Sequence, residues 1–242
     1  MSLAVAIGLK ACWVKEEKKI ELKGTFINQS YLEHSADTLL NAIPFYCTEL
    51  VFDHPDSVMV RNGVEEYLLK YEMKQDTCFV KNAYQHKGTL KDLALILSSD
   101  TVFVALDQDF TGNTQPARFH KTSIFRGFEY GLNEATVAGK YTLVNGGAQK
   151  NEPVIFSADG RIKGLPAYDK FSVCYSGDCM SEPLEASNVI MLENTQNKVE
   201  YAVWSYDEKT KLLTLYALED AKPDIKGERA VKSKLLELRK IV

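Results

Sequence analysis

One short pattern occurs twice in the chain, as Leu22-Lys23-Gly24-Thr25-Phe26-Ile27-Asn28 and as Val137-Ala138-Gly139-Lys140-Tyr141-Thr142-Leu143. Each copy begins a series of short runs in which β-branched and aromatic residues dominate, and such residues favour strands. A pattern that returns at a long interval indicates a repeated structural unit. The sequence therefore predicts two copies of one β-rich unit.

Three later pairs of strand-like runs keep the same order in both halves. They are residues 49–53 with 153–157, 101–106 with 212–217, and 117–121 with 234–239. Asn-Gly and Asp-Gly pairs between runs supply the positive-φ residues that tight hairpins require. Short strands separated by regular turns are typical of β-sandwiches and β-barrels.

Two stretches have helical rather than β spacing. Ser30 and Glu33 form a capping box, and apolar residues then recur at helical spacing until Pro44, which predicts a helix after the opening strand. Residues 124–137 place Phe125 on one apolar stripe with three further residues, Phe128, Leu132 and Ala135. Such a stripe indicates a helix that packs against a core.

We therefore predict a mainly β protein with two tandem antiparallel β-barrels, one short inserted helix and a linker helix. Residues 1–20 form a partial signal segment and tether, and residues 21–122 form the first barrel. The linker helix spans 123–136, and the second barrel spans 137–242. A chain of 242 residues suits one large domain or two small ones.

The N-terminus carries a lipoprotein-like signal. The apolar run 3–9 is shorter than the roughly 20 residues that a membrane-spanning helix needs. In Leu9-Lys10-Ala11-Cys12, a small residue precedes a cysteine and a leucine lies three positions before it, which is the arrangement that a lipoprotein signal peptidase accepts. The sequence favours lipidation of Cys12 and a place in the bacterial cell envelope, on the periplasmic side or the outer-membrane surface; a buried N-terminal strand is the alternative.

The four other cysteines form an even set, which permits pairing in an oxidising compartment. Cys174 and Cys179 flank a Ser-Gly-Asp turn signal, so their thiols can meet across a hairpin. A disulfide between them and a pair of buried free thiols are both consistent with this spacing. Cys47 and Cys78 each lie in an apolar run, where burial without bonding fits equally well.

Two resemblances add to this interpretation. The opening Gly24-Thr25-Phe26-Ile27-Asn28 with Tyr31-Leu32-Glu33, and the later Ala138-Gly139-Lys140-Tyr141, resemble lipoproteins of Bacteroidetes-type envelopes with two calycin-like, lipocalin-like barrels. Residues 156–175, with an Asp-Gly-Arg turn before a Gly and a Phe, resemble the central strand pair of the META domain, with Tyr168-Asp169 in the place of that family's Cys-Asn. These resemblances imply an anchored, outward-facing binding or structural module and supply no catalytic residue.

Signatures of catalysis and of metal binding are missing from the sequence. No phosphate-binding loop, dinucleotide fingerprint, nucleophile elbow or zinc-protease motif occurs. Residues 107–113 begin like a calcium loop, but position twelve is Arg118 instead of the bidentate Glu, so a polar hairpin loop is favoured. We therefore predict no catalytic residue, no metal and no cofactor.

Aromatic residues of the second unit are the candidates for ligand contact. Trp204 and Tyr206 are two positions apart and therefore share a strand face. Tyr168 and Tyr175 flank the same unit, and rings at the mouth of a barrel can stack on flat or apolar ligands. The alternative is that these rings fill the barrel.

The net charge of the chain limits which classes of partner it can bind. A net charge of −4 lacks the basic surface of a protein that binds nucleic-acid phosphates. The sequence thus favours a non-enzymatic envelope lipoprotein, tied to the membrane by its lipid, that binds a small ligand, a glycan or a protein. The alternatives are a hydrolase with acidic residues in the cleft between the units, and an inhibitor of a protease or lysozyme.

Overall fold

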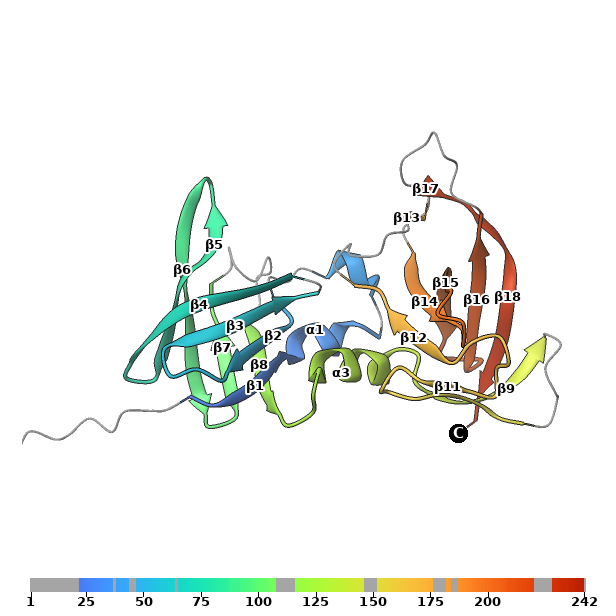
Figure 1. Ribbon diagram of the computed structural model, residues 1–242, viewed down its shortest axis with the longest axis horizontal. Helices are drawn as coiled ribbons and strands as arrows, with labels where there is room; N and C mark the ends of the chain where they lie inside the picture. Colours follow the sequence, from blue (N-terminus) through green and yellow to red (C-terminus); the bar gives the residue numbers. More distant parts are fainter. Residues whose placement is uncertain are drawn as a thin grey trace, which may run out of the picture.

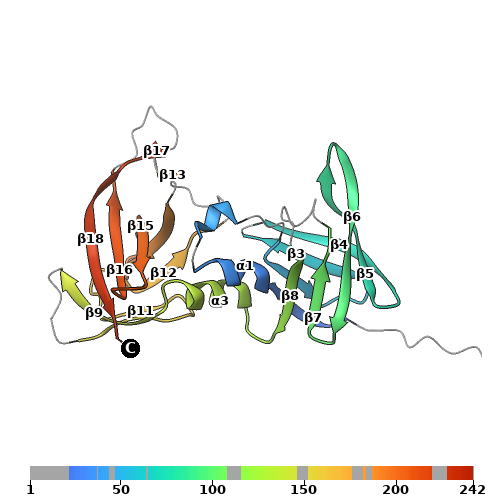
Figure 2. The same ribbon diagram turned by 180° about the vertical axis from the view of Figure 1, so that it is seen from behind.

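The computed structural model describes residues 22–36, 38–43, 47–63, 65–107, 116–145, 152–175, 182–183, 187–219 and 228–241. Within these ranges the chain is mainly β, with two α-helices, α1 (Gln29–His34) and α3 (Gly127–Ala135), and the short 3-10 helix η1 (Leu40–Ala42). Two β units lie at opposite ends of the long axis, with α1 and α3 between them (Figures 1 and 2). The segment predicted as a signal and tether, residues 1–20, lies outside the described residues.

The first unit is a closed antiparallel barrel. Its eight strands are β1 (Gly24–Asn28), β2 (Glu49–Phe52), β3 (Ser57–Asn62), β4 (Glu65–Lys74), β5 (Thr77–His86), β6 (Thr89–Ser99), β7 (Val102–Ala105) and β8 (Ala117–Thr122). Each strand pairs with the next, and β1 closes the barrel by pairing with β8. The rings of Phe26, Phe52 and Phe103 meet inside it, with centroids 4.7–5.7 Å apart. The predicted mainly β architecture and one closed barrel are confirmed.

The second unit is an eight-stranded sheet in the order β11-β10-β9-β18-β16-β15-β14-β12. Its strands are β9 (Gly139–Asn145), β10 (Val154–Phe156), β11 (Ile162–Lys163), β12 (Lys170–Val173), β14 (Asn188–Glu193), β15 (Val199–Asp207), β16 (Leu212–Leu218) and β18 (Val231–Lys240). A separate parallel pair joins β13 (Glu182–Pro183) to β17 (Glu228–Arg229). An isolated bridge between Arg161 and Lys170 links the two edges of the large sheet.

The strand order follows the repeat in the sequence. β1 and β9 are the equivalent strands, and each pairs both with the next strand and with the last strand of its unit. Even the register is shared, because Gly24 of β1 faces Phe52 of β2 and Gly139 of β9 faces Phe156 of β10. The units differ between their third and fourth strands, where β3 and β4 pair over six residues and β11 meets β12 only through the bridge.

The helix predicted after Ser30 is shorter than expected and begins earlier. Its N-cap is Asn28, whose Oδ1 accepts the backbone N–H of Tyr31 at 3.0 Å. The Ser30 hydroxyl instead accepts the backbone N–H of Arg118 in β8 at 2.9 Å. The Ser35 hydroxyl donates to the carbonyl three residues earlier, at the end of α1. The capping-box prediction was therefore wrong, because the hydroxyl expected to cap the helix serves a contact with the barrel.

The segment between β1 and β2 packs into the other unit. Tyr31, Leu32, Leu40 and Ile43 belong to the hydrophobic core that the second sheet and α3 form. Leu40 also donates its backbone N–H to Oδ1 of Asn188 in β14 at 2.9 Å. The core of the second unit is therefore completed by residues that lie before β2 in the sequence.

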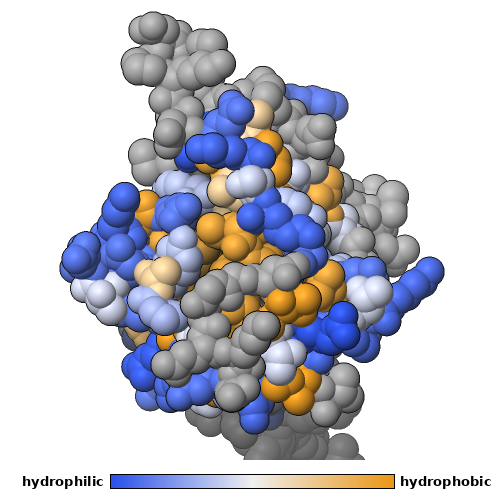
Figure 3. Space-filling model, turned by 90° about the vertical axis from the view of Figure 1, so that its right-hand side faces the viewer, coloured by the Kyte–Doolittle hydropathy of each residue, from blue (hydrophilic) through white to orange (hydrophobic). Residues whose placement is uncertain are grey.

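Apolar residues of the second unit also reach its outer surface. Seen from the end of the molecule that this unit forms, hydrophobic residues gather near the middle of the face and hydrophilic residues surround them (Figure 3). Leu143 in β9 and Leu235 and Leu236 in β18 are partly exposed and pack against the core. None of the described helices combines the length and the apolar composition that crossing a membrane requires.

Candidate ligand site between the two units

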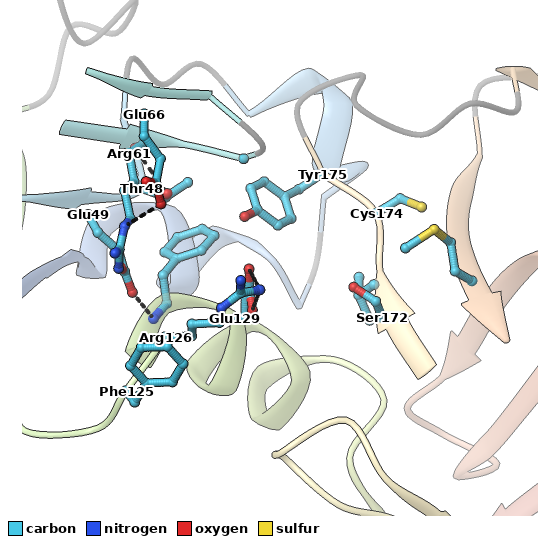
Figure 4. Close-up of a pocket in the computed structure, with 14 residues that line it drawn as sticks. Thr48, Glu49, Arg61, Glu66, Phe125, Arg126, Glu129, Ser172, Cys174 and Tyr175 are labelled. Carbon is cyan, nitrogen blue, oxygen red and sulfur yellow. Dashed lines mark hydrogen bonds and ion pairs between the residues drawn. The ribbon is translucent and has the colours of Figure 1, made fainter. Parts of the chain in front are cut away.

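A cavity of about 380 Å³ lies between the two units. This volume falls in the lower part of the range of small-ligand sites, about 300–1,000 Å³. Its walls come from β2 to β4 of the barrel, from the start of α3, and from β12 and β14 of the second sheet (Figure 4). The cavity therefore exists only when both units are in place.

The barrel wall of the cavity carries three ionised side chains. Arg61 donates from Nη1 to Oε2 of Glu49 at 2.9 Å, and its Nε lies 2.9 Å from Oε1 of Glu66. Burial acts to lower the pKa of the Arg61 guanidinium, but the hydrogen bond to Glu49 and the charges of both carboxylates outweigh burial and raise it. Glu49 is only 3% exposed, so its charge is stable there because Arg61 compensates it.

The second oxygen of Glu49 reaches the linker helix. Its Oε1 accepts the backbone N–H of Phe128, in the first turn of α3, at 3.0 Å. Arg126 occupies the N-cap position with φ 50° and makes no capping bond through its side chain. Because the first N–H groups of a helix need acceptors, Glu49 acts as the cap from a distant strand. This contact fixes the start of α3 against the barrel.

Aromatic rings form the side of the cavity next to α3. The Phe128 ring lies 5.1 Å from Tyr175 and 5.4 Å from Tyr31 between centroids. Burial, and next the neighbouring Tyr175, raise the pKa of Tyr31, whose hydroxyl donates to the carbonyl of Leu40 at 2.8 Å. These rings add an apolar surface beside the ion pair of Arg126 and Glu129 at the start of α3.

The rim of the cavity carries an exposed aromatic ring. Phe125 lines the cavity and is 82% exposed. The predicted apolar stripe placed Phe125 inside a helix over 124–137, and that placement was wrong. α3 begins at Gly127, and the left-handed backbone of Arg126 turns the preceding residue out of the helix. Arg126 lies 5.9 Å from the Phe125 ring and 3.4 Å from the carboxylate of Glu129.

The four aromatic candidates occupy different places. Tyr175 lines the cavity, whereas Trp204 lies in the core of the second unit and is 5% exposed. Tyr168 and Tyr206 are half-buried against the same core. The Tyr168 hydroxyl donates to Oε2 of Glu200 at 2.6 Å, and burial together with this bond raises the Tyr168 pKa. The structure thus brings only Tyr175 of this set to the cavity.

The cysteines fall into two groups. Cys174 lines the cavity and is disulfide-bonded. Cys179, its predicted partner, and Cys12, the predicted lipid site, lie outside the described residues. Cys47 and Cys78 are buried free thiols of the first barrel, and burial raises the pKa of Cys78 to about 12.

The described lining residues offer no free acid, base or metal site. Glu49 and Glu66 face Arg61, and Glu129 faces Arg126. None of the residues that line the cavity is a histidine. Within the described ranges, no group of three or more His, Cys, Asp and Glu residues is placed to hold a metal ion. Of the calcium-like loop 107–113, only Asp107 is described, and its carboxylate accepts the hydroxyl of Tyr84.

Sequence reasoning missed most of this cavity. Glu49 and Phe128 are 79 positions apart, and no spacing rule connects them. The one local signal is Glu49 itself, a charged residue at the start of an otherwise apolar run, Leu50-Val51-Phe52, in a strand that is buried throughout. Comparisons of the chain with protein-family models, with curated proteins and with solved structures gave no match.

Proposed function

We propose that this protein is a non-enzymatic binding protein of the bacterial cell envelope, and that the cavity between its units holds a small ligand. The observation that carries the proposal is that every carboxylate lining the cavity already faces a guanidinium group. A hydrolase needs a group that can give or take a proton at the reacting atom. Glu49 has both oxygens occupied, by Arg61 and by the N–H of Phe128. The arrangement favours recognition over catalysis.

We also propose that the units are a tandem pair of calycin-like barrels, the second opened between β11 and β12. The common strand order and the shared Gly-Phe register support this. Near the bridge, the backbone N–H of Ile162 donates to the carbonyl of Asp169, and that of Phe171 donates to the carbonyl of Gly160, both at 2.8 Å. These two bonds join the edges that a closed barrel would pair.

Lipidation of Cys12 and an extracytoplasmic location complete the proposal. The disulfide at Cys174 supports an oxidising compartment, because disulfides persist outside the cytosol. Mass spectrometry of the protein expressed with its full native leader should find diacylglycerol on Cys12 and no residues before it. A chain that keeps residues 1–11 and carries no lipid contradicts the anchor, and Cys12→Ala is the control that cannot be lipidated.

The ligand site is tested by filling the cavity. Ser172 in β12 is half-buried and faces the cavity from the second sheet, so Ser172→Phe should occupy part of it while Ser172→Ala leaves it open. A thermal-shift panel of neutral and acidic oligosaccharides, fatty acids and lysophospholipids should contain a compound that raises the Tm of the wild type and of Ser172→Ala. The same compound should leave the Tm of Ser172→Phe unchanged.

Catalysis is tested on the same compound. After prolonged incubation with the protein, mass spectrometry should recover the stabilising compound unchanged. A compound that is cleaved by the wild type and by Ser172→Ala would replace the binding proposal with the hydrolase. Stabilisation that persists fully in Ser172→Phe would place the ligand elsewhere on the molecule.

A further inference from the structure

We propose, on the basis of the binding function above, that the cavity takes a neutral, hydroxyl-rich ligand with one apolar face, as a short neutral oligosaccharide has. The proposal rests on the charge balance of the cavity walls and on the exposed ring at the rim. The first observation concerns charged side chains of the barrel wall and of α3, and the second concerns an apolar side chain in the segment before α3.

Charge balance disfavours an ionised ligand. Two arginines and three glutamates line the cavity, and each arginine faces a carboxylate of the protein. The walls carry one more carboxylate than guanidinium groups, so they repel an anionic ligand unless it displaces a carboxylate, which would leave that group unpaired. The third carboxylate, which has no guanidinium of its own, is that of Glu66. Its side chain is 52% exposed, so water and salt weaken its attraction for a cationic ligand. A neutral ligand disturbs none of these pairs.

Hydroxyl groups match what the paired side chains still offer. A carboxylate has about four lone-pair sites and a guanidinium has five N–H donors, so the Arg61 cluster keeps both donors and acceptors beyond its ion pairs. A hydroxyl is at once a donor and an acceptor, and it can bond to such a cluster without separating the charges. Ser172 adds a hydroxyl from the opposite wall. Ligands with many hydroxyls therefore fit the polar walls.

The exposed ring supplies the apolar half of the site. A phenylalanine that is 82% exposed at the edge of a cavity gains hydrophobic stabilisation only when a ligand or partner covers it. The negative face of an aromatic ring attracts the C–H groups of a sugar ring. Phe125 lies beside the guanidinium of Arg126, so a ring stacked on Phe125 would have a polar donor close to its edge.

The test uses matched sugars that differ in charge. Isothermal titration would compare neutral trisaccharides of glucose, galactose, mannose and N-acetylglucosamine with triglucosamine as the cationic set and trigalacturonic acid as the anionic set. We expect at least one neutral trisaccharide to bind more tightly than both charged ones. Its Kd should change less than about twofold between 50 and 500 mM NaCl, because no net charge is neutralised on binding.

Two exposed apolar residues provide the variant and its control. Phe125→Ala should weaken binding of the neutral sugar about tenfold, the usual size of one lost ring contact. Leu90→Ala in β6 removes a side chain that is 59% exposed and does not line the cavity, and it should leave the Kd unchanged. Both positions are exposed, so neither substitution should lower the Tm.

The outcomes separate this inference from the proposed function. Tighter binding of a charged trisaccharide that Ser172→Phe and Phe125→Ala both weaken would overturn the neutral class and leave the cavity as the ligand site. Binding of a fatty acid or lysophospholipid that both variants weaken, with no sugar bound, would also overturn the neutral-sugar class. The cavity would still be the ligand site. Neutral sugar binding that neither variant weakens would overturn both proposals.

Discussion

Glu49 in β2 accepts a hydrogen bond from the backbone N–H of Phe128 in α3, with 3.0 Å between Oε1 and the nitrogen. The other oxygen of the same carboxylate binds Arg61 in β3. One buried side chain therefore joins two strands of the barrel to the helix that leads into the second unit. The Glu49 carboxylate therefore helps to orient the two units in addition to forming the ion pair with Arg61.

Removing this carboxylate should destabilise the protein strongly. Glu49→Ala leaves the guanidinium of Arg61 half-buried without its main partner and leaves an N–H of α3 without its cap, so we expect a loss of about 3 kcal/mol in the free energy of unfolding. Glu49→Gln keeps an acceptor for Phe128 and should cost about half as much. Urea unfolding measures both values.

Glu66→Ala is the matched control for this prediction. It removes the other carboxylate that faces Arg61, but the Glu66 side chain is 52% exposed and such pairs contribute at most about 1 kcal/mol. Equal losses in Glu49→Ala and Glu66→Ala would show that the bond to Phe128 adds nothing to stability.

Local patterns predicted the strands well because each strand carries its own signal. The β-branched and aromatic residues of 101–106 predicted a strand, and the structure forms β7 there, with half-buried and buried residues in alternation. The repeat between residues 22–28 and 137–143 also ordered the strands, since a shared register reflects a shared hydrophobic pattern.

Contacts between residues far apart in the sequence left no local signal. Phe125 matches the spacing of the apolar stripe, yet the left-handed backbone of Arg126 turns its side chain into solvent. The spacing of apolar residues contains no information on that φ angle. Ser30 is a good helix cap in isolation, but a backbone N–H of β8 competes for its oxygen. The cavity was missed for the same reason, because Glu49 and Tyr175 come to line one cavity only through the tertiary fold.

The shared core predicts that a residue of the first unit stabilises the second. Leu40 is 1% exposed within the core of the second unit, so Leu40→Ala should cost about 2–5 kcal/mol. Hydrogen exchange should become faster for the amides of β14 to β16, although Leu40 lies more than a hundred positions before them.

Leu95→Ala is the control for this long-range effect. Leu95 is equally buried but belongs to the core of the first barrel, so its loss should speed exchange mainly in β5 to β7. If Leu40→Ala made amide hydrogen exchange faster only in the first barrel, that result would contradict a core shared by the two units.

The edge of the second sheet depends on a glycine. Gly164 has φ 81°, and a Cβ built there would lie 2.5 Å from the carbonyl oxygen of Pro153. Gly164→Ala should therefore combine backbone strain with a steric clash and cost about 3 kcal/mol in the free energy of unfolding. Gly88 in the β5–β6 turn has a similar φ of 79° with no atom within 4 Å, so Gly88→Ala should cost only about 1 kcal/mol. Thermal unfolding that gives the same loss for both variants would show that Pro153 moves aside freely.

Alkaline pH should destabilise the protein through its buried phenols and thiols. Burial raises the pKa of Tyr31, Tyr141, Cys47 and Cys78, with Cys78 reaching about 12. In the unfolded chain these groups ionise near pH 9–10, while in the folded protein they keep their protons. Stability is therefore fully present below about pH 9 and falls as the pH rises, by up to about 1.4 kcal/mol per pH unit for each such group.

Tyr141→Phe isolates one of these groups. The Tyr141 hydroxyl is buried and donates to the carbonyl of Val137 at 2.8 Å, so the variant should be about 1 kcal/mol less stable at pH 7. Above pH 10 the variant has one fewer group whose ionisation favours unfolding, so its stability should fall less steeply than that of the wild type. Urea unfolding at pH 7, 9, 10 and 11 should show the gap narrowing as the pH rises. Parallel curves for the two proteins would mean that Tyr141 ionises as readily in the folded protein as in the unfolded chain.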